Sequence, residues 1–499
     1  MSRTFHLADL FETVAEAVPE RVALVAGARR LTYRDLDRRA DRCAGHLARR
    51  MGVRPGDRVG VLAHDRAEWK ECELACFKLR AVPVNLDYRH DGGELGHVLR
   101  DSGAGALVGE PELLARVPWF ANTLAYGEPY ERALAEAVPA VRGPRSGDDP
   151  YLLYTGGATG RPKGVLWRHE DAFFGAMGGG AFLGCPVSSP RQLADNAVAG
   201  VGLRMLSCSP LMQAAGQWLS WVCHTTAGTL VLWTGRGFDP RAVVALAAAE
   251  RAQVLALAGD AMAVPLLGAL RQGDLVTLAA VVTGAATMSP EVKQRLHAAV
   301  PGLAVIFDAL GGCESGAACL AVGGGFEPSD GTAVLGPDLR PVEPGGSGML
   351  ARTGRIPLRY WSTPGEAVFR EDADGRRWVL QGDLARVEDD GTITLLGREH
   401  NVIRTGGRAV QAEEVEAVVR AHPAVYDAVV VGVPDPGLGQ LVAVIVAPLA
   451  PLTLAELAAH CGRSLAAYQV PRVLKQVGEI QRSPAGKADY TWARSVAQT

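Results

Sequence analysis

The sequence has little lysine, no long hydrophobic run and no excess of charge of either sign. Only six of its 51 basic residues are lysine, at positions 70, 78, 163, 293, 475 and 487. The formal net charge of −3 gives no basic surplus for nucleic acid, and there is no acidic tail. No apolar run reaches the roughly 18 residues of a membrane-spanning helix. We therefore expect a protein that neither binds nucleic acid nor crosses a membrane.

Metal-binding patterns of cysteine and histidine are also absent. The nine cysteines are scattered, and neither CxxC nor HExxH occurs, which argues against a zinc site. Cys72 and Cys76 lie one helical turn apart, and we interpret them as part of a packed helix face. The first 18 residues carry acids in an amphipathic helical pattern, unlike a secretory signal. These features predict a reduced, cytoplasmic protein.

A chain of 499 residues is too long for one core, so two or more domains are expected. Helical patterns alternate with short apolar segments. One helical face is formed by Leu7, Leu10, Phe11, Val14 and Val18, and another follows the candidate N-cap Thr32 at Leu36, Ala40, Cys43 and Leu47. Strands are predicted at VALVAG, RVGVLA and AVPVNL and at residues 151–155, 229–233, 253–259, 279–284 and 303–310. This alternation predicts α/β layers.

Two segments have the character of boundaries. RGPRSGDDP, residues 142–150, is rich in turn formers and predicts a subdomain linker. The last hundred residues change pattern, with helices predicted at 412–422 and 452–465 and strands at 427–433 and 441–447. We predict a large α/β domain with several subdomains over 1–397 and a small α+β domain over 398–499.

A glycine-rich loop follows the strand predicted at 151–155. Its sequence, YTGGATGRPKGV (154–165), combines four glycines with two threonines and one of the six lysines. Backbone N–H groups of such a loop can turn toward an anion, and a mobile ammonium suits phosphate. Lys163 is followed by Gly164, so the Walker A pattern is not met. A glycine-rich surface loop without function remains the alternative for this motif alone.

Four further motifs follow in order. They are TGAATMSPEV (283–292), DALGGCESG (308–316), QGDLARVEDDGTITLLGR (381–398) and RSPAGKADY (482–490). With the glycine-rich loop, and over nearly the whole chain, they resemble the AMP-forming adenylating superfamily of acyl- and aryl-CoA ligases, adenylation domains and luciferases. The segments GVLWRHED and SPAGKADY are most similar to those of actinobacterial fatty-acyl and steroid-acyl CoA ligases.

The resemblance implies an adenylate-forming fold, whose small C-terminal domain moves, and a use for ATP and Mg²⁺. CoA is a possible acceptor. It implies catalytic roles for Lys487, Glu314 and Lys163, with Glu314 also binding the metal. It implies phosphate binding at Thr155, Gly156, Gly157, Thr159 and Gly160, and adenine binding at Gly284, Ala285 and Ala286. It adds Asp308, Leu310 and Cys313 to the cofactor site and gives the ribose to Asp383 and Arg398. The substrate pocket would include Met212, Gln213 and Gly216.

The chain departs from the family pattern mainly around acceptor and substrate. Gln213 replaces a histidine that lies beside the substrate carboxylate in relatives, and Ala214 replaces the next glycine. Cys313 stands for the threonine before the metal glutamate, and Leu310 for an aromatic residue. In the segment that faces the thiol-acceptor step, Arg408 replaces glutamate and Ala412 replaces proline. Arg359 stands at a common glycine, without an assigned consequence, and His400 at the domain seam replaces a frequent aspartate.

Four functions fit these motifs. The leading prediction is an ATP-dependent ligase that adenylates a carboxylate and transfers it to CoA. Gln213 and the altered acceptor segment motivate a second, in which nitrite is adenylated and passed to an aryl amine in secondary metabolism. A catalytically inactive nucleotide-binding scaffold is a third, motivated by Cys313. Transfer of the acyl group to a carrier protein is the fourth. The oligomeric state is left open.

Overall fold

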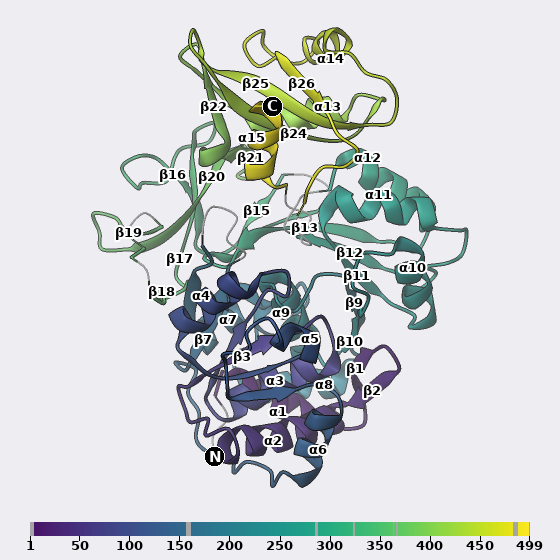
Figure 1. Cartoon of the computed structure of the whole chain (residues 1–499), viewed down its shortest axis with the longest axis vertical. Helices are drawn as coiled ribbons and strands as arrows, with labels where there is room; N and C mark the ends of the chain where they lie inside the picture. Colours follow the sequence, from purple (N-terminus) through teal and green to yellow (C-terminus); the bar gives the residue numbers. More distant parts are fainter. Residues whose placement is uncertain are drawn as a thin grey trace. The chain divides into compact units, whose positions relative to one another are not determined.

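The structure is a computed structural model that describes residues 4–155, 161–284, 288–322, 325–362, 364–365, 368–482 and 488–498. The chain forms two compact units. The first comprises residues 1–324 and 353–369, and the second comprises residues 325–352 and 370–499. Both units mix helices with strands, in agreement with the predicted fold class (Figure 1). The boundary predicted at residue 397 falls inside the second unit, and the position of the hinge stays a prediction.

The largest sheet of the first unit contains β1 (Val22–Ala26), β2 (Arg29–Thr32), β9 (Arg204–Ser207), β10 (Thr229–Leu232), β11 (Val254–Leu257), β12 (Ala280–Gly284), β13 (Val305–Gly312) and β14 (Gly316–Val322). Their order is β14-β13-β12-β11-β9-β10-β1-β2. The strands from β13 to β1 run parallel, while β14 and β2 pair antiparallel with their neighbours. Central parallel strands are buried on both faces and are therefore continuous apolar runs, such as VLAL in β11. The strands predicted from such runs are confirmed.

A second sheet of the first unit is wholly parallel, in the order β4-β3-β5-β6. Its strands are β3 (Arg58–Leu62), β4 (Val82–Asn85), β5 (Ala104–Gly109) and β6 (Thr123–Ala125). Ligands of parallel sheets bind at the carboxyl ends of the strands. At this edge β4 ends in Asn85, and Asp65 follows β3.

The glycine-rich loop connects two strands of a small antiparallel sheet. The sheet contains β7 (Pro150–Tyr154), β8 (Gly164–Arg168) and β18 (Arg359–Tyr360), in the order β18-β8-β7. Tyr360 of β18 lies opposite Val165 of β8. This pairing carries a residue from far along the chain to the end of the glycine-rich loop.

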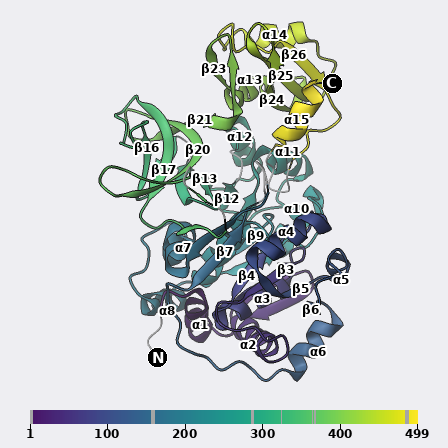
Figure 2. The same ribbon diagram turned by 60° about the vertical axis from the view of Figure 1, so that its left-hand side comes forward.

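The helices of the first unit are α1 (Leu7–Ala17), α2 (Tyr33–Arg49), α3 (Ala67–Lys78), α4 (Gly92–Ser102), α5 (Pro111–Leu114), α6 (Glu128–Glu136), α7 (His169–Ala176), α8 (Pro190–Ala199), α9 (Ala214–Thr225), α10 (Pro240–Ala249), α11 (Gly259–Ala269) and α12 (Pro290–Ala299). Thr32 caps α2 as predicted, in a reciprocal capping box with Asp35. Helix α3 packs against α1 and α2 (Figure 2) and is buried on all sides, so Cys72 and Cys76 are packed as expected.

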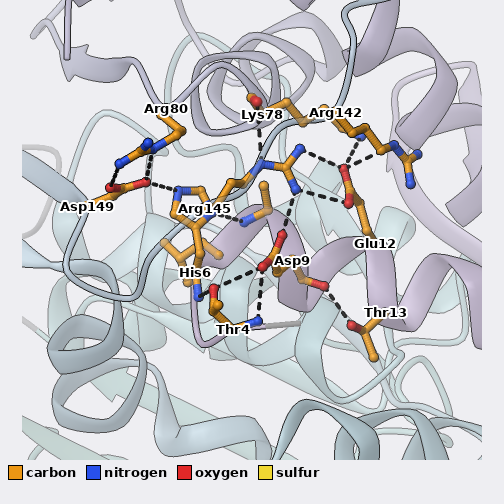
Figure 3. A network of polar contacts seen from close by, with 12 residues as sticks. Thr4, His6, Asp9, Glu12, Thr13, Lys78, Arg80, Arg142, Arg145 and Asp149 are labelled. Atoms are coloured by element: carbon orange, nitrogen blue, oxygen red, sulfur yellow. Dashed lines mark hydrogen bonds and ion pairs between the residues drawn. The ribbon is translucent and has the colours of Figure 1, made fainter. Parts of the chain in front are cut away.

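The segment 142–150 is the expected irregular connection, but charged side chains fasten it (Figure 3). Arg145 is buried and bonds to Asp9 and Glu12 of α1 at 2.7 and 3.0 Å. Asp149 accepts two hydrogen bonds from Arg80. The linker is therefore held against the helices that precede it.

The second unit contains two sheets. In one, β16 (Thr332–Leu335), β17 (Ser347–Thr353), β20 (Arg377–Val387) and β19 (Phe369–Glu371) are neighbours in that order, and β21 (Ile393–Arg398) pairs with β20. The short β15 spans Glu327–Pro328. In the other, the order is β23 (Arg408–Gln411), β22 (Val402–Thr405), β25 (Gly439–Pro448) and β24 (Val425–Asp435), with β26 (Val473–Gln476) on β25.

Alternate residues of β24 and β25 point to opposite faces of the last sheet. Val430 and Val444 lie in one buried cluster with α13 (Ala412–Arg420) and α14 (Leu454–Cys461). Val429 and Val431 lie in another cluster with α15 (Tyr490–Gln498). Figure 1 shows these helices around the sheet. Among the described residues, no helix is both long and apolar enough to span a bilayer.

Candidate active site

The two ends of the glycine-rich loop are held together by backbone and hydroxyl contacts. The N–H of Thr155 donates to the carbonyl of Lys163 over 3.0 Å, and the N–H of Lys163 donates to Oγ1 of Thr155 over 3.3 Å. Lys163 is exposed. Four of the predicted phosphate ligands, Gly156, Gly157, Thr159 and Gly160, lie outside the described residues. We call these two paired residues, Thr155 and Lys163, the neck of the loop. The exposed ammonium of Lys163 lies at this neck.

Tyr360 joins two of the predicted catalytic residues. The Lys163 ammonium lies 5.2 Å from the centroid of the Tyr360 ring, within the range of cation–π attraction. The Tyr360 hydroxyl donates to Oε1 of Glu314 over 3.0 Å. Burial and the Glu314 charge raise the pKa of Tyr360, so its hydroxyl stays protonated and keeps donating. The structure therefore brings Lys163 to the ring and Glu314 to the hydroxyl of one buried side chain.

Sequence reasoning missed Tyr360. It lies in none of the five motifs, and its neighbour Arg359 was noted only as a departure from the family pattern. The contact arises from the pairing of β18 with β8, across almost 200 residues of sequence. A tyrosine directly after the departing position was the one available signal.

The predicted adenine side is organised by Asp308. Its buried carboxylate forms an ion pair with Lys293 of α12 and accepts a hydrogen bond from the N–H of Met288 over 3.1 Å. Gly284 ends β12 opposite Ala309 of β13. Ala285 and Ala286 lie outside the described residues. Asp308 thus holds the chain that follows the predicted adenine loop, which is a supporting contact in addition to its predicted place in the cofactor site.

The turn between β13 and β14 carries the predicted metal ligand. Glu314 and Cys313 are partly buried there, and Leu310 is partly buried on β13. The carbonyl of Cys313 accepts a hydrogen bond from the Trp167 indole over 2.9 Å. This bond uses the backbone of Cys313, so the replacement of threonine by cysteine does not disturb it.

The predicted substrate residues surround the start of α9. Met212 is buried, Gln213 is partly buried and its backbone precedes the first helical turn. At Gly216 an added Cβ would lie 2.2 Å from the carbonyl oxygen of Pro210, so only glycine allows this close approach. Trp218 and Trp221 are buried on the same helix. The structure therefore places Met212, Gln213 and Gly216 in one tightly packed segment.

The second unit holds the predicted ribose residues. Asp383 of β20 lies directly opposite Arg398 of β21, and the Arg398 guanidinium donates to the Asp383 carboxylate over 3.0 Å. Arg408 lies 4.8 Å from the Tyr468 ring centroid, and Ala412 is fully buried at the start of α13. Lys487 lies outside the described residues. Of the two departures in the acceptor segment, Arg408 therefore packs on an aromatic ring and Ala412 lies in the core.

Glu314 offers a carboxylate ligand of the kind that Mg²⁺ prefers. Among the described residues, no cluster of three or more histidine, cysteine or acidic side chains could hold a metal. Mg²⁺ is a hard cation that binds through one or two carboxylates plus substrate phosphates and water. A single carboxylate, which shares its neighbour Tyr360 with a lysine suited to phosphate, matches that donor set.

Known proteins resemble this chain over almost its full length. A 3-oxocholest-4-en-26-oate–CoA ligase from Rhodococcus rhodochrous is 39% identical, with 98% of this chain and 95% of the relative covered. A feruloyl-CoA synthase from an Amycolatopsis species is 32% identical, with 95% of each covered. The first relative is named for 3-oxocholest-4-en-26-oate and the second for a feruloyl group.

Solved structures show the same fold. An anthranilate CoA ligase in complex with anthranoyl-AMP has a TM-score of 0.86 at 22% identity, covering 100% of this chain and 98% of that one. The o-succinylbenzoate coenzyme A synthetase of Bacillus subtilis with ATP and magnesium has a TM-score of 0.84 at 23% identity, covering 98% and 99%. The AMP-binding enzyme model matches residues 11–353, and the model of its C-terminal domain matches 414–487. This chain belongs to the AMP-binding enzyme family and is an ATP-dependent, AMP-forming ligase.

Proposed function

We propose that this protein is a carboxylate–CoA ligase for a largely apolar acid of the fatty-acyl or steroid side-chain kind. The observation that carries the proposal is the arrangement of Lys163, Tyr360 and Glu314, which joins a cation for phosphate to a carboxylate for Mg²⁺. The curated relatives support the substrate class, since several are named for fatty acids and for 3-oxocholest-4-en-26-oate.

The proposed reaction has two steps. A carboxylate oxygen of the acid attacks the α-phosphorus of ATP, and the bond to the β-phosphate breaks, releasing pyrophosphate. The CoA thiolate then attacks the acyl carbon, and AMP leaves. Lys163 and the loop around it would hold the leaving phosphates, Lys487 would offset charge at the α-phosphate, and Asp383 with Arg398 would bind the ribose. Bound Mg²⁺ would neutralise phosphate charge beside Glu314.

Rotation of the C-terminal domain, residues 398–499, about the segment 397–407 between the two steps is part of the proposal. Such a motion needs only a few residues whose backbone angles can change. A cytoplasmic location is also proposed, because ATP and CoA are supplied there.

Gln213 changes how the acid would be held. A glutamine amide can donate a hydrogen bond to a carboxylate, but unlike histidine it cannot become cationic. We therefore propose that the acid gains its affinity chiefly from apolar contacts. The nitrite hypothesis motivated by Gln213 gains no support, because the relatives are CoA ligases of carboxylic acids, and it is not retained. The inactive scaffold motivated by Cys313 is not retained either, because the matching family and the relatives are enzymes.

The test measures pyrophosphate, AMP and thioester formation by purified protein from ATP and Mg²⁺ with a panel of fatty, steroidal and aromatic acids, with and without CoA. We expect acid-dependent pyrophosphate release and a thioester only when CoA is present. Pyrophosphate release without any thioester would contradict CoA as acceptor and favour a carrier protein. Release with aromatic acids alone would contradict the proposed substrate class.

A further inference from the structure

Asn85 is a buried amide that contacts two segments of the candidate site. It ends β4, and only 6% of its surface is exposed. Its Nδ2 group donates to the carbonyl of Tyr154 over 3.0 Å and to the carbonyl of Met212 over 2.7 Å. Its Oδ1 accepts from the N–H of Tyr154 over 2.8 Å. Rotating the amide by 180° would face its oxygen toward two carbonyls, so the contacts define one orientation.

The first contact lies directly beside the neck of the glycine-rich loop. Tyr154 is the last residue of β7, and Thr155, which bonds to Lys163 at the neck, follows it. Asn85 bonds both backbone groups of Tyr154, as a neighbouring strand would. A shift of the neck therefore has to move or strain the Asn85 amide.

The second contact lies in the substrate segment. Met212 precedes Gln213, the residue in place of the family histidine. The neighbouring N–H of Leu211 donates to Oδ1 of Asp65 over 2.8 Å, so two consecutive residues of this segment are held from the edge of the parallel sheet. Within the segment, the close approach of Gly216 to Pro210 limits the conformations of the backbone. The segment has little freedom to move independently of Asn85.

We propose that Asn85 is a positioning residue that couples the phosphate loop to the substrate segment, with Asp65 as its partner at Leu211. The route runs from Lys163 and Thr155 through Tyr154 and the Asn85 amide to Met212. Contact of ATP with the described residues Thr155 and Lys163 thereby restricts the segment that receives the acid. The inference rests on the proposed function for the identity of the two ligands.

The chain contains a matched control for the amide. Asn122 also donates its Nδ2 group to two backbone carbonyls, those of Met51 and Gly105, over 2.9 and 2.8 Å. It bonds to the same parallel sheet at Gly105, but these two bonds do not go to the glycine-rich loop or to the substrate segment. Asn122→Ala therefore removes the same kind of double hydrogen bond, while the contacts between the loop and the substrate segment through Asn85 remain.

The test measures hydrogen exchange of peptides covering residues 204–218, with and without ATP, in the full-length protein. We expect ATP to slow exchange in the wild type and in Asn122→Ala at least threefold, and to leave it unchanged in Asn85→Ala. Asn85→Asp keeps the shape but faces an oxygen toward the two carbonyls, and it should behave like Asn85→Ala. Asp65→Asn, which retains an acceptor for Leu211, should keep the ATP response, whereas Asp65→Ala should weaken it.

Several outcomes would overturn the coupling. One is ATP binding to the wild type with no change in residues 204–218, and another is an unchanged ATP response in Asn85→Ala. If Asn85→Ala does not fold, Asn85→Ser, which can donate to one carbonyl, provides the same comparison. A wild type that binds no ATP would instead contradict the proposed function. Steady-state rates add a second readout: Asn85→Ala should raise KM for the acid about tenfold, and Asn122→Ala should not.

Discussion

Tyr360 acts through two different parts of one side chain, which can be removed separately. Its ring lies beneath the Lys163 ammonium, and its hydroxyl bonds to Glu314. Phenylalanine keeps the ring and loses the hydroxyl, while leucine loses both. The two substitutions therefore separate the proposed metal-side and phosphate-side contributions.

We predict that Tyr360→Phe raises the Mg²⁺ concentration needed for half-maximal pyrophosphate release about tenfold, because a hydrogen bond to a charged group contributes about 1.5–3 kcal/mol. KM for ATP at saturating Mg²⁺ should change little. Tyr360→Leu should in addition raise that KM about three- to fivefold, since the cation–π contact contributes about 0.5–1 kcal/mol at exposed sites. Identical Mg²⁺ and ATP profiles for the two variants would show that the ring has no role of its own.

At the scale of elements, the contact between α3 and α9 depends on a buried ion pair. The Lys70 ammonium is fully buried and bonds to Glu73 over 2.5 Å and to the hydroxyl of Ser220 over 2.8 Å. It also lies 4.1 Å from the Trp221 ring centroid. Because α9 follows the substrate segment directly, the contacts of this pair with α9 help to hold that segment in place.

We predict that Lys70→Met lowers the free energy of unfolding by about 3–5 kcal/mol, because it leaves the Glu73 carboxylate buried without its cation. Adding Glu73→Leu should recover much of the loss, since two apolar side chains need no partner. Thermal unfolding followed by circular dichroism checks this order. A double variant less stable than Lys70→Met would mean that Glu73 stabilises the helices through its bond with Trp221 instead.

A histidine pair links α7 to the chain before α1. His6 and His169 are buried, and their rings stack with centroids 4.0 Å apart. His6 lies beside Asp149, within the charged contacts of Figure 3. Nδ1 of His169 accepts the N–H of Leu7 over 3.1 Å. Burial lowers the pKa of His169 to about 4, and burial together with the nearby His169 lowers the pKa of His6 as well.

We predict an acid-sensitive stability from this pair. In the unfolded chain a histidine has a pKa of about 6.5. Below that pH the unfolded state therefore binds protons that the folded state, with its lower histidine pKa values, does not bind. The free energy of unfolding should therefore fall by about 1 kcal/mol per pH unit for each histidine as the pH drops from about 6.5 toward 4. His169→Asn, which keeps an acceptor for Leu7, should flatten the dependence of Tm on pH, whereas His97→Asn on α4 should not. Parallel Tm curves for all three proteins would contradict it.

The elements predicted from the sequence were those with a local signal. The strand predicted at 253–259 contains the apolar run VLAL, which forms β11, and Thr32 is followed three residues later by an acid. Helix α3 shows the limit, because its charged residues suggest a solvated face but all are buried, at positions 68, 70, 71, 73 and 78. Lys78 finds its carboxylate partners on α1 and α2. Such pairing depends on tertiary contacts that no local pattern contains, as does the approach of Tyr360 to Glu314.

At the scale of the whole molecule, the proposed reaction assigns different steps to different residues of the second unit. Lys487 is predicted to act only while the acyl-adenylate forms, at the α-phosphate. It would have no part when the CoA thiolate displaces AMP, because the other pose of the domain serves that step. The two half-reactions can therefore be separated by one substitution, and the small number of lysines offers a control in Lys475 of β26.

We predict that Lys487→Ala lowers acid-dependent pyrophosphate release by about 100-fold or more, since removing one group that stabilises transition-state charge costs about 10²–10³ in rate. With a synthetic acyl-adenylate and CoA, its rate of thioester formation should stay within about threefold of the wild type. Lys475→Ala should leave both rates near those of the wild type. An equal loss in both half-reactions would mean that Lys487 serves domain packing or CoA binding, and the assignment of the two steps to two poses of the C-terminal domain would then lose its support.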